Sequence, residues 1–297
     1  MAEIKLFKLG NNVEELTSKS VTVEKELQNI IEKNMAEFFG VTFLDSEYKI
    51  DNGRMDSIGI DENNCPVIFE YKRHSSENVI NQGLFYLNWL LEHKANFKLL
   101  VLEKLGNKLA NEIDWSMPRV ICIANDFNKY DEEAIKQINR NVSLIRYKKY
   151  GNELVLFELL NTNTVAPLEI EKEVINKKQV DKSFIEQYSN APIKFKAIFD
   201  ELKEFALSLG DDVTANILKL YTAFKRIKNF ATMEIYQSNI RLNLKLNPEE
   251  FKSQFSDTLR DIRNIGHWGC GDLQLIIKEN DDITLAKDLI KKAYDEN

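Results

Sequence analysis

Two residues in a short apolar run, Glu70 and Lys72, have the types and spacing to hold a cation and a water beside a phosphodiester. The run, Pro66 to Lys72, has the composition of a β-strand. Side chains of a strand alternate between its two faces, so Glu70 and Lys72 project together and the residues between them project oppositely. An acid and a lysine so spaced are equally typical of a half-solvated sheet face, and the rest of the sequence must decide.

Asp56 lies one predicted strand earlier, and a short turn joins the two strands. We expect them to be antiparallel neighbours, with the Asp56 and Glu70 carboxylates within a few ångströms of each other. Two such carboxylates repel, and one pKa rises unless a cation compensates. Mg²⁺ or Mn²⁺ suits an oxygen-only site with few protein ligands, and Lys72 can then position a water. The competing interpretation is an ordinary surface network of little energetic value.

Three further polar residues are candidates for the same site. Glu24 borders the apolar face of an amphipathic helix expected over about 23–38, where Glu26 is its competitor. The helix dipole alone also favours acids at this end. Gln82 and Tyr86 are four residues apart in a helix expected over 78–92, so they share one of its faces.

The order Asp56, Glu70-Tyr71-Lys72, Gln82 and Tyr86 resembles the PD-(D/E)XK nuclease superfamily in its RecB-like version. The resemblance is closer to the nuclease domain of the NucS-like endonucleases and covers roughly residues 1–160, including 24–28, 53–56 and 114–116. It implies Asp56 and Glu70 as ligands of Mg²⁺ or Mn²⁺ and Lys72 as the catalytic lysine. Glu24, Gln82 and Tyr86 would complete the catalytic set or contact DNA. The N-terminal DNA-clamp domain of the NucS-like proteins has no counterpart in this sequence, so the resemblance implies no DNA specificity.

Binding DNA requires a local source of positive charge, because the net charge is −7 and the pI about 5.3. Residues 140–150 contain no acid, and two tyrosines suited to stacking on an unpaired base are interleaved with their cations. A strand edge guarded by lysines gives the same pattern. The candidate DNA contacts are Arg54, Arg146, Lys148 and Lys149.

The predicted elements form an α/β domain over 1–160, a restriction-endonuclease-like mixed sheet flanked by helices. A charged, partly helical linker over 161–194 and a smaller α+β domain over 195–297 follow. We expect strands over 43–50, 66–72, 98–103, 119–124, 142–147 and 153–160, and a helix over 131–139. In the second domain we expect strands over 216–224, 228–236, 239–246 and 273–277, with helices over 195–207, 248–265 and 284–294.

The second domain resembles a small domain of unknown function often found behind nuclease-like domains, through 221–226, 266–272 and 289–294. Relatives sometimes carry a transport label, but no apolar stretch approaches the roughly 20 residues of a membrane span. A glycine-rich turn over 266–271 lacks the Lys-Ser/Thr of a P-loop. We interpret the domain as a targeting or binding module.

The three cysteines are far apart and no signal peptide is evident, which predicts a reducing compartment, the cytoplasm. The leading hypothesis is a Mg²⁺- or Mn²⁺-dependent DNA endonuclease in restriction, defence or repair, with a homodimer conceivable for cutting two strands. The alternative is a catalytically inactive nucleic-acid-binding or protein-interaction module. A third interpretation assigns the function to the second domain, which would bind a ligand or protein.

Overall fold

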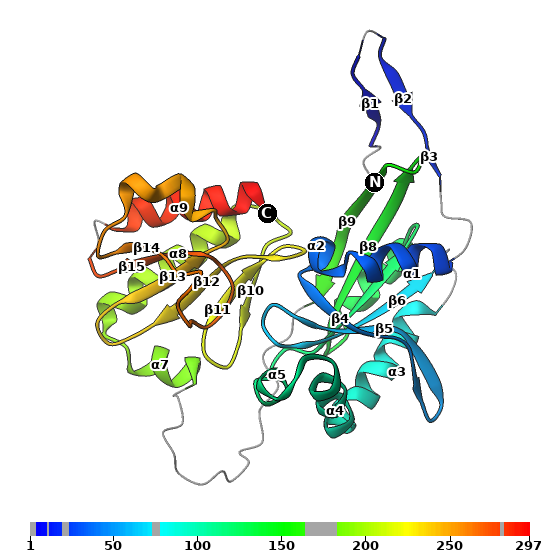
Figure 1. The fold of residues 1–297 in the computed structure, drawn as a ribbon, viewed down its shortest axis with the longest axis horizontal. Coiled ribbons are helices and arrows are strands. Elements are labelled where there is room, and N and C mark those ends of the chain that lie inside the picture. The colour runs from blue at the N-terminus through cyan, green and yellow to red at the C-terminus, as the bar shows by residue number, and fades with distance from the viewer. Residues whose placement is uncertain (1–3, 11, 20–23, 73–77, 164–182, 280–281) are drawn as a thin grey trace.

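The computed structural model describes residues 4–10, 12–19, 24–72, 78–163, 183–279 and 282–297. They form two large sheets with separate cores and a two-stranded hairpin, and the mixed α/β fold predicted from the sequence is confirmed (Figure 1). No helix among these residues is both long and apolar enough to cross a membrane.

The first sheet has seven strands in the order β3-β8-β7-β6-β5-β4, with β9 beside β8. Its centre is parallel, since β6 pairs β7 and β7 pairs β8 in parallel, whereas β4, β5 and β9 run antiparallel to their neighbours. The bounds are β3 Ser18–Lys19, β4 Val41–Ile50, β5 Gly53–Asp61, β6 Pro66–Lys72, β7 Arg119–Ala124, β8 Asn141–Tyr150 and β9 Leu154–Asn163.

Helices cover both faces of this sheet, which is why β6 and β7 read as nearly continuous apolar runs. One face packs on α1 (Glu24–Lys33) and α2 (Met35–Phe39). The other packs on α3 (Val79–Glu92), α4 (Lys94–Leu105), α5 (Asn107–Asn111) and α6 (Lys129–Ile135). A separate hairpin, β1 (Leu6–Lys8) with β2 (Glu14–Leu16), projects beyond the sheet (Figure 1).

Several predicted elements of this domain differ from the structure. The strand expected over 98–103 is wrong, because these residues belong to α4, whose buried Phe97, Leu100 and Val101 follow helical spacing. The helix expected over 23–38 is interrupted at Asn34, and α2 ends at Gly40, whose φ of 62° is in the left-handed region. The helix expected over 131–139 runs from Lys129 to Ile135.

The second sheet is antiparallel throughout, in the order β10-β11-β12-β13-β15-β14. Helices α7 (Phe184–Asn190), α8 (Ile193–Ser208) and α9 (Asp282–Glu296) enclose an apolar core with it. The strands are β10 Thr214–Ile217, β11 Thr222–Lys225, β12 Asn229–Ile235, β13 Ile240–Leu244, β14 Leu259–Asp261 and β15 Leu273–Ile277.

Two predictions for this region need correction. The helix expected over 248–265 is a short 3₁₀ helix, Pro248–Gln254, followed by β14, because Leu259 joins the sheet opposite Leu275. The strand expected over 216–224 is a hairpin of β10 and β11. Of the linker expected over 161–194, residues 164–182 lie outside the described part, 161–163 belong to β9, and 184–190 form α7.

The turn between β5 and β6 makes hydrogen bonds to the second domain. The Oδ1 atom of Asp61 accepts hydrogen bonds from the backbone N–H groups of Asn63 and Cys65, both at 2.9 Å. Asn63 Oδ1 then accepts from the Tyr221 hydroxyl at 3.1 Å and from Asn229 Nδ2 at 2.7 Å, in the second domain. A small apolar cluster lies beside these bonds: Cys65, Met117, Leu218, Leu220, Tyr221 and Ala223.

The interface also buries charge. Asp61 pairs with Arg119, and Glu62 pairs with Lys245 across the interface. Lys225 is 8% exposed. Burial, and then the positive charge of Arg119, lowers the pKa of Lys225 to about 7, although Asp61 and Glu62 act in the opposite direction.

We predict that Lys225→Met changes the pH dependence of stability. Between about pH 7 and the ordinary lysine pKa near 10.4, the unfolded chain binds a proton that the folded chain does not. The contribution of Lys225 to the free energy of unfolding is therefore greatest at high pH and falls as pH decreases towards 7. The variant should be the more stable protein at pH 7, and its advantage should shrink towards pH 10, measured by urea unfolding.

Lys219→Met is the matched control, since Lys219 is an exposed lysine of the same domain. The difference in the free energy of unfolding between Lys219→Met and wild type should be the same at every pH. A Lys225→Met protein that is less stable than wild type at pH 7 would show that the charged amine is satisfied in the interface.

Candidate active site

Asp56 and Glu70 are brought together by the antiparallel pairing of β5 with β6. Ser57 pairs with Phe69 and Ile58 with Ile68, so Asp56 and Glu70 are the next neighbours on the same sheet face as Ile58 and Ile68. Glu70 Oε1 accepts from the Asp56 backbone N–H at 3.3 Å, and Asp56 Oδ2 accepts from the Tyr71 N–H at 3.0 Å. Each carboxyl group is thus held by the backbone of the opposite strand.

The surroundings of this pair disfavour two negative charges. Glu70 is 2% exposed. Burial, followed by the charge of Asp56, raises the pKa of Glu70 to about 9, and the two side chains are close enough to hydrogen-bond. Burial also raises the pKa of Asp56, with the Tyr71 N–H and Lys72 acting against it. A positive charge placed between the carboxyl groups would relieve both penalties.

Lys72 ends β6 at the margin of this pair, on the same face as Glu70. Its charge acts on both carboxyl groups, and its Nζ lies 3.8 Å from Glu24 Oε2. Glu24 is the first residue of α1, so the N-terminus of that helix lies at the same end of the sheet. The structure therefore brings together four of the residues singled out from the sequence.

Tyr86 and Gln82 have different positions on α3. Tyr86 is buried, and its hydroxyl accepts from the Arg54 backbone N–H at 3.3 Å, two residues from Asp56. Gly53 permits this approach, because a Cβ there would lie 2.8 Å from the Tyr86 ring. Gln82 is exposed and makes no hydrogen bond to the site carboxyl groups among the described contacts. Of the two, Tyr86 contacts the strand that carries Asp56, and the roles predicted for both residues stay predictions.

Gln28 supports the site and was missed by the motif search. It is 4% exposed, and its Nε2 donates to the Asp56 carbonyl at 2.7 Å, to Glu32 Oε1 at 2.8 Å and to Ser46 Oγ at 3.1 Å. Helical spacing in the sequence predicts this role, because residues 24, 27, 28 and 31 share one face of α1. A glutamine on that face needs a buried polar partner.

The candidate DNA contacts are mostly neutralised by neighbouring acids. The buried Arg146 guanidinium pairs with Glu158 at 2.6 Å and Asp126 at 3.1 Å, which argues against its predicted contact with DNA. Lys149 pairs with Glu26 at 2.5 Å. Lys148 is half-buried on β8.

Arg54 is exposed and lies on the strand of Asp56. Its Nε lies 2.6 Å from Glu47, which also binds Lys25 at 3.0 Å. Glu47 has a φ of 55°, an uncommon conformation for a residue other than glycine. Of the candidate contacts, Arg54 therefore has the position best suited to reach a ligand at the carboxyl pair.

The donor set fits Mg²⁺ or Mn²⁺, because these ions prefer oxygen ligands and Mg²⁺ is commonly held by one or two carboxylates. Within the described residues, no three histidine, cysteine or acidic side chains converge to form a metal cluster. Any ion here would accordingly be held by Asp56 and Glu70, with water and substrate completing its ligands.

Comparison with known proteins gives three findings. Residues 185–297 match the model of a family described as a domain of unknown function, DUF5655. The chain is 29% identical over 290 residues to an uncharacterised protein of Haemophilus influenzae, covering 94% of this chain and 95% of that protein. A repair endonuclease from Pyrococcus abyssi is similar in structure with a TM-score of 0.29 and 14% identity, over 48% of this chain and 64% of that chain.

The family match agrees with the sequence-based resemblance of the second domain to a domain of unknown function. The likeness to the endonuclease is too slight to carry an argument about activity. The site's geometry must therefore support any functional conclusion by itself.

We predict that Gln28→Leu lowers the free energy of unfolding by roughly 1–3 kcal/mol, because the Asp56 carbonyl and Glu32 lose a buried donor. Gln82→Leu, the same substitution at an exposed helix position, should stay within about 0.5 kcal/mol of wild type. Urea unfolding of the three proteins measures both effects. Equal stability of the two variants would mean that Gln28 does not support the site.

Proposed function

We propose that the first domain is a Mg²⁺- or Mn²⁺-dependent endonuclease that hydrolyses DNA phosphodiester bonds. The observation that supports this most directly is the Asp56–Glu70 pair, a buried glutamate beside a half-buried aspartate, each held by the backbone of the opposite strand, with Lys72 adjacent. Two like charges placed close together inside a fold lower its stability, and a structural role would need only one carboxyl group. A cation-binding site accounts for the presence of two.

The roles of the residues follow from their positions. A bound ion supplies Lewis acidity at the phosphoryl oxygen and offsets charge in the transition state. Asp56 and Glu70 would hold it, each fixed by a hydrogen bond from the other strand. Lys72 Nζ, beside both carboxyl groups, can donate to the attacking water or to a phosphate oxygen. Glu24 lies close enough to Lys72 to orient its amine.

DNA is the proposed substrate because Arg54 lies exposed next to the site, where it can exchange Glu47 for a phosphate. Restriction, defence or repair are the settings in which such an activity would act. The neutralisation of Arg146 and Lys149 by acids favours the second candidate, a fold retained without catalysis.

We predict that Mn²⁺ binds the wild-type protein and stabilises it, because a cation between the two carboxyl groups removes the penalty that raises the pKa of Glu70 and lets both groups ionise. At about 100-fold excess over the dissociation constant, the stabilisation should be about 2.7 kcal/mol. It should be reversed by EDTA and lost in Asp56→Asn and Glu70→Gln. Asp51→Asn, a substitution in the exposed turn before β5, serves as the control. Calorimetric titration and thermal unfolding provide the measurements.

We also predict metal-dependent cleavage of plasmid and single-stranded DNA by the wild-type protein. Asp56→Ala and Lys72→Ala should reduce the rate by at least about 100-fold, the usual scale for losing a catalytic group. Lys49→Ala, which removes an exposed lysine from the neighbouring strand, should cleave like wild type. Salt-dependent DNA binding without cleavage by any protein would instead support the non-catalytic alternative.

A further inference from the structure

The second domain has a row of buried polar side chains across the face of its sheet opposite the helices. Arg260 Nη2 donates to Gln274 Oε1 at 2.6 Å, and Gln274 Nε2 donates to Asn243 Oδ1 at 2.8 Å. Asn243 Nδ2 reaches Glu234 Oε1 at 3.4 Å. Asn243, Gln274 and Glu234 are 0–2% exposed, so the row lies inside the domain. A fully hydrogen-bonded buried network of this kind restricts the motion of the side chains in it.

The row ends on two aromatic residues. The Tyr236 hydroxyl donates to Glu234 Oε2, and the Arg241 guanidinium lies 4.6 Å from the centre of the Tyr236 ring. The backbone carbonyl of Trp268 accepts from Asn243 Nδ2 at 2.9 Å. Trp268 is nevertheless 41% exposed. The network therefore holds the Tyr236 hydroxyl and the Trp268 backbone carbonyl. The exposed surface of the Trp268 side chain stays open to a ligand.

The glycines after Trp268 allow its loop to lie against the sheet. Gly269 has a φ of 79°, and a Cβ there would lie 2.5 Å from Thr232 Oγ1. The Thr232 hydroxyl also donates to the Cys270 carbonyl at 3.3 Å. The loop therefore lies against β12, and the backbone of Trp268 is held in place by the fold.

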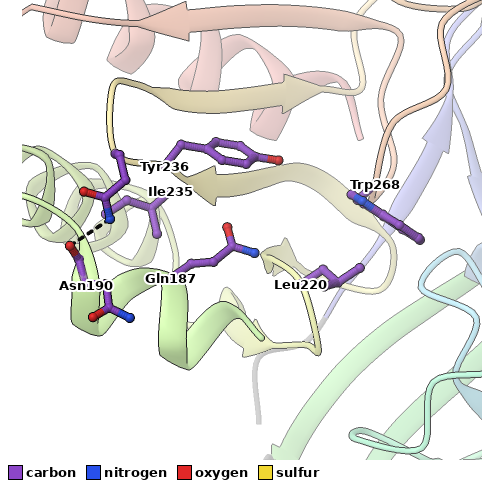
Figure 2. A pocket seen from close by; sticks show the side chains of 7 residues that line it. Gln187, Asn190, Leu220, Ile235, Tyr236 and Trp268 are labelled. Carbon is purple, nitrogen blue, oxygen red and sulfur yellow. Dashed lines mark hydrogen bonds between the residues drawn. The ribbon is translucent and has the colours of Figure 1, made fainter. Parts of the chain in front are cut away.

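Tyr236 and Trp268 line a cavity of about 250 Å³, together with Leu220 and Ile235 (Figure 2). The other lining residues carry carboxamides: Gln187 and Asn190 of α7, and Gln237 after β12. Gln237 Nε2 donates to the Asn190 carbonyl at 2.8 Å, and Asn190 Nδ2 donates to the Glu186 carbonyl at 2.7 Å. Each bond uses one N–H of the NH₂ group, and the side-chain oxygen takes part in neither bond.

We infer that this cavity binds one unpaired nucleobase, as a free nucleoside or within a single strand. No charged side chain lines it, so a phosphate would remain outside. Aromatic surface with carboxamide edges matches a flat heterocycle that carries donors and acceptors on its rim. The volume is just below the usual range for small-molecule sites, about 300–1,000 Å³, which suits one ring system. This inference is independent of cleavage by the first domain.

Calorimetric titration of the full chain in EDTA, where no cleavage occurs, tests the proposal. The probes are adenosine, guanosine, cytidine and thymidine, a short single-stranded oligonucleotide, and the same oligonucleotide with abasic sites. Binding of a nucleoside would identify a free ligand. Binding of the oligonucleotide but of no nucleoside would identify a base within a strand. In both cases Trp268→Ala should weaken binding at least about fivefold, the lower end for loss of a stacked base.

Trp268→Phe should restore much of the affinity, because it retains a stacking surface. Gln237→Ala should weaken binding through loss of an acceptor. Phe255→Ala, at an aromatic residue of similar exposure outside the cavity, should bind like wild type. The proposal is overturned if no probe binds, if the abasic oligonucleotide binds as well as the complete one, or if the Trp268→Ala protein, shown to unfold cooperatively, binds unchanged.

Discussion

The structure depends on one buried carboxylate, that of Asp61. It accepts two backbone hydrogen bonds within the β5–β6 turn and pairs with Arg119 at the start of β7. These contacts fix the register of β5 with β6, and a slip of one residue would turn Asp56 to the opposite face from Glu70. The same turn presents Asn63 to Tyr221 and Asn229. One tight turn thus sets both the candidate active site and the docking of the second domain.

The charges around the site follow a consistent arrangement. Glu70 is buried and Asp56 half-buried beside the Lys72 amine, and nearby cations are held by acids, Arg54 and Lys25 by Glu47 and Lys149 by Glu26. A cation entering the site gains the attraction of the carboxylates without having to displace a salt bridge between them. A DNA phosphate must instead compete with surface acids, which involves weak, screened pairs. Under the proposed function, this arrangement would favour binding of the metal first and would make DNA affinity dependent on salt.

The sequence predicted those parts of the fold where a pattern repeats over several residues. Strands β6 and β7 have the bounds expected, because both are largely apolar runs, and the placement of Glu70 with Lys72 on one face followed from strand alternation. It failed at α4, where the run 99–102 looks like a strand although the buried residues follow helical spacing. Gln82 is more exposed than Tyr86, because a four-residue spacing in a helix places two side chains on one side only to within part of a turn. The pairing of Arg146 with Asp126 joins residues on different elements, which no local pattern reveals.

An acidic protein with one exposed arginine beside its site has little electrostatic attraction for DNA, so recognition of the proposed substrate would have to come from contacts that do not depend on net charge. The second domain offers such contacts in the aromatic and carboxamide lining of its cavity, since stacking and hydrogen bonding to a base edge require no positive charge. The two domains meet through hydrogen bonds around Asn63 and a small apolar cluster, in addition to the chain that links them. A base held in the second domain would consequently restrict which phosphodiesters of the same strand can reach Asp56 and Glu70. Substrate choice would then reside in the distance between the two sites and in the need for an unpaired base, with the catalytic domain itself contributing little sequence preference.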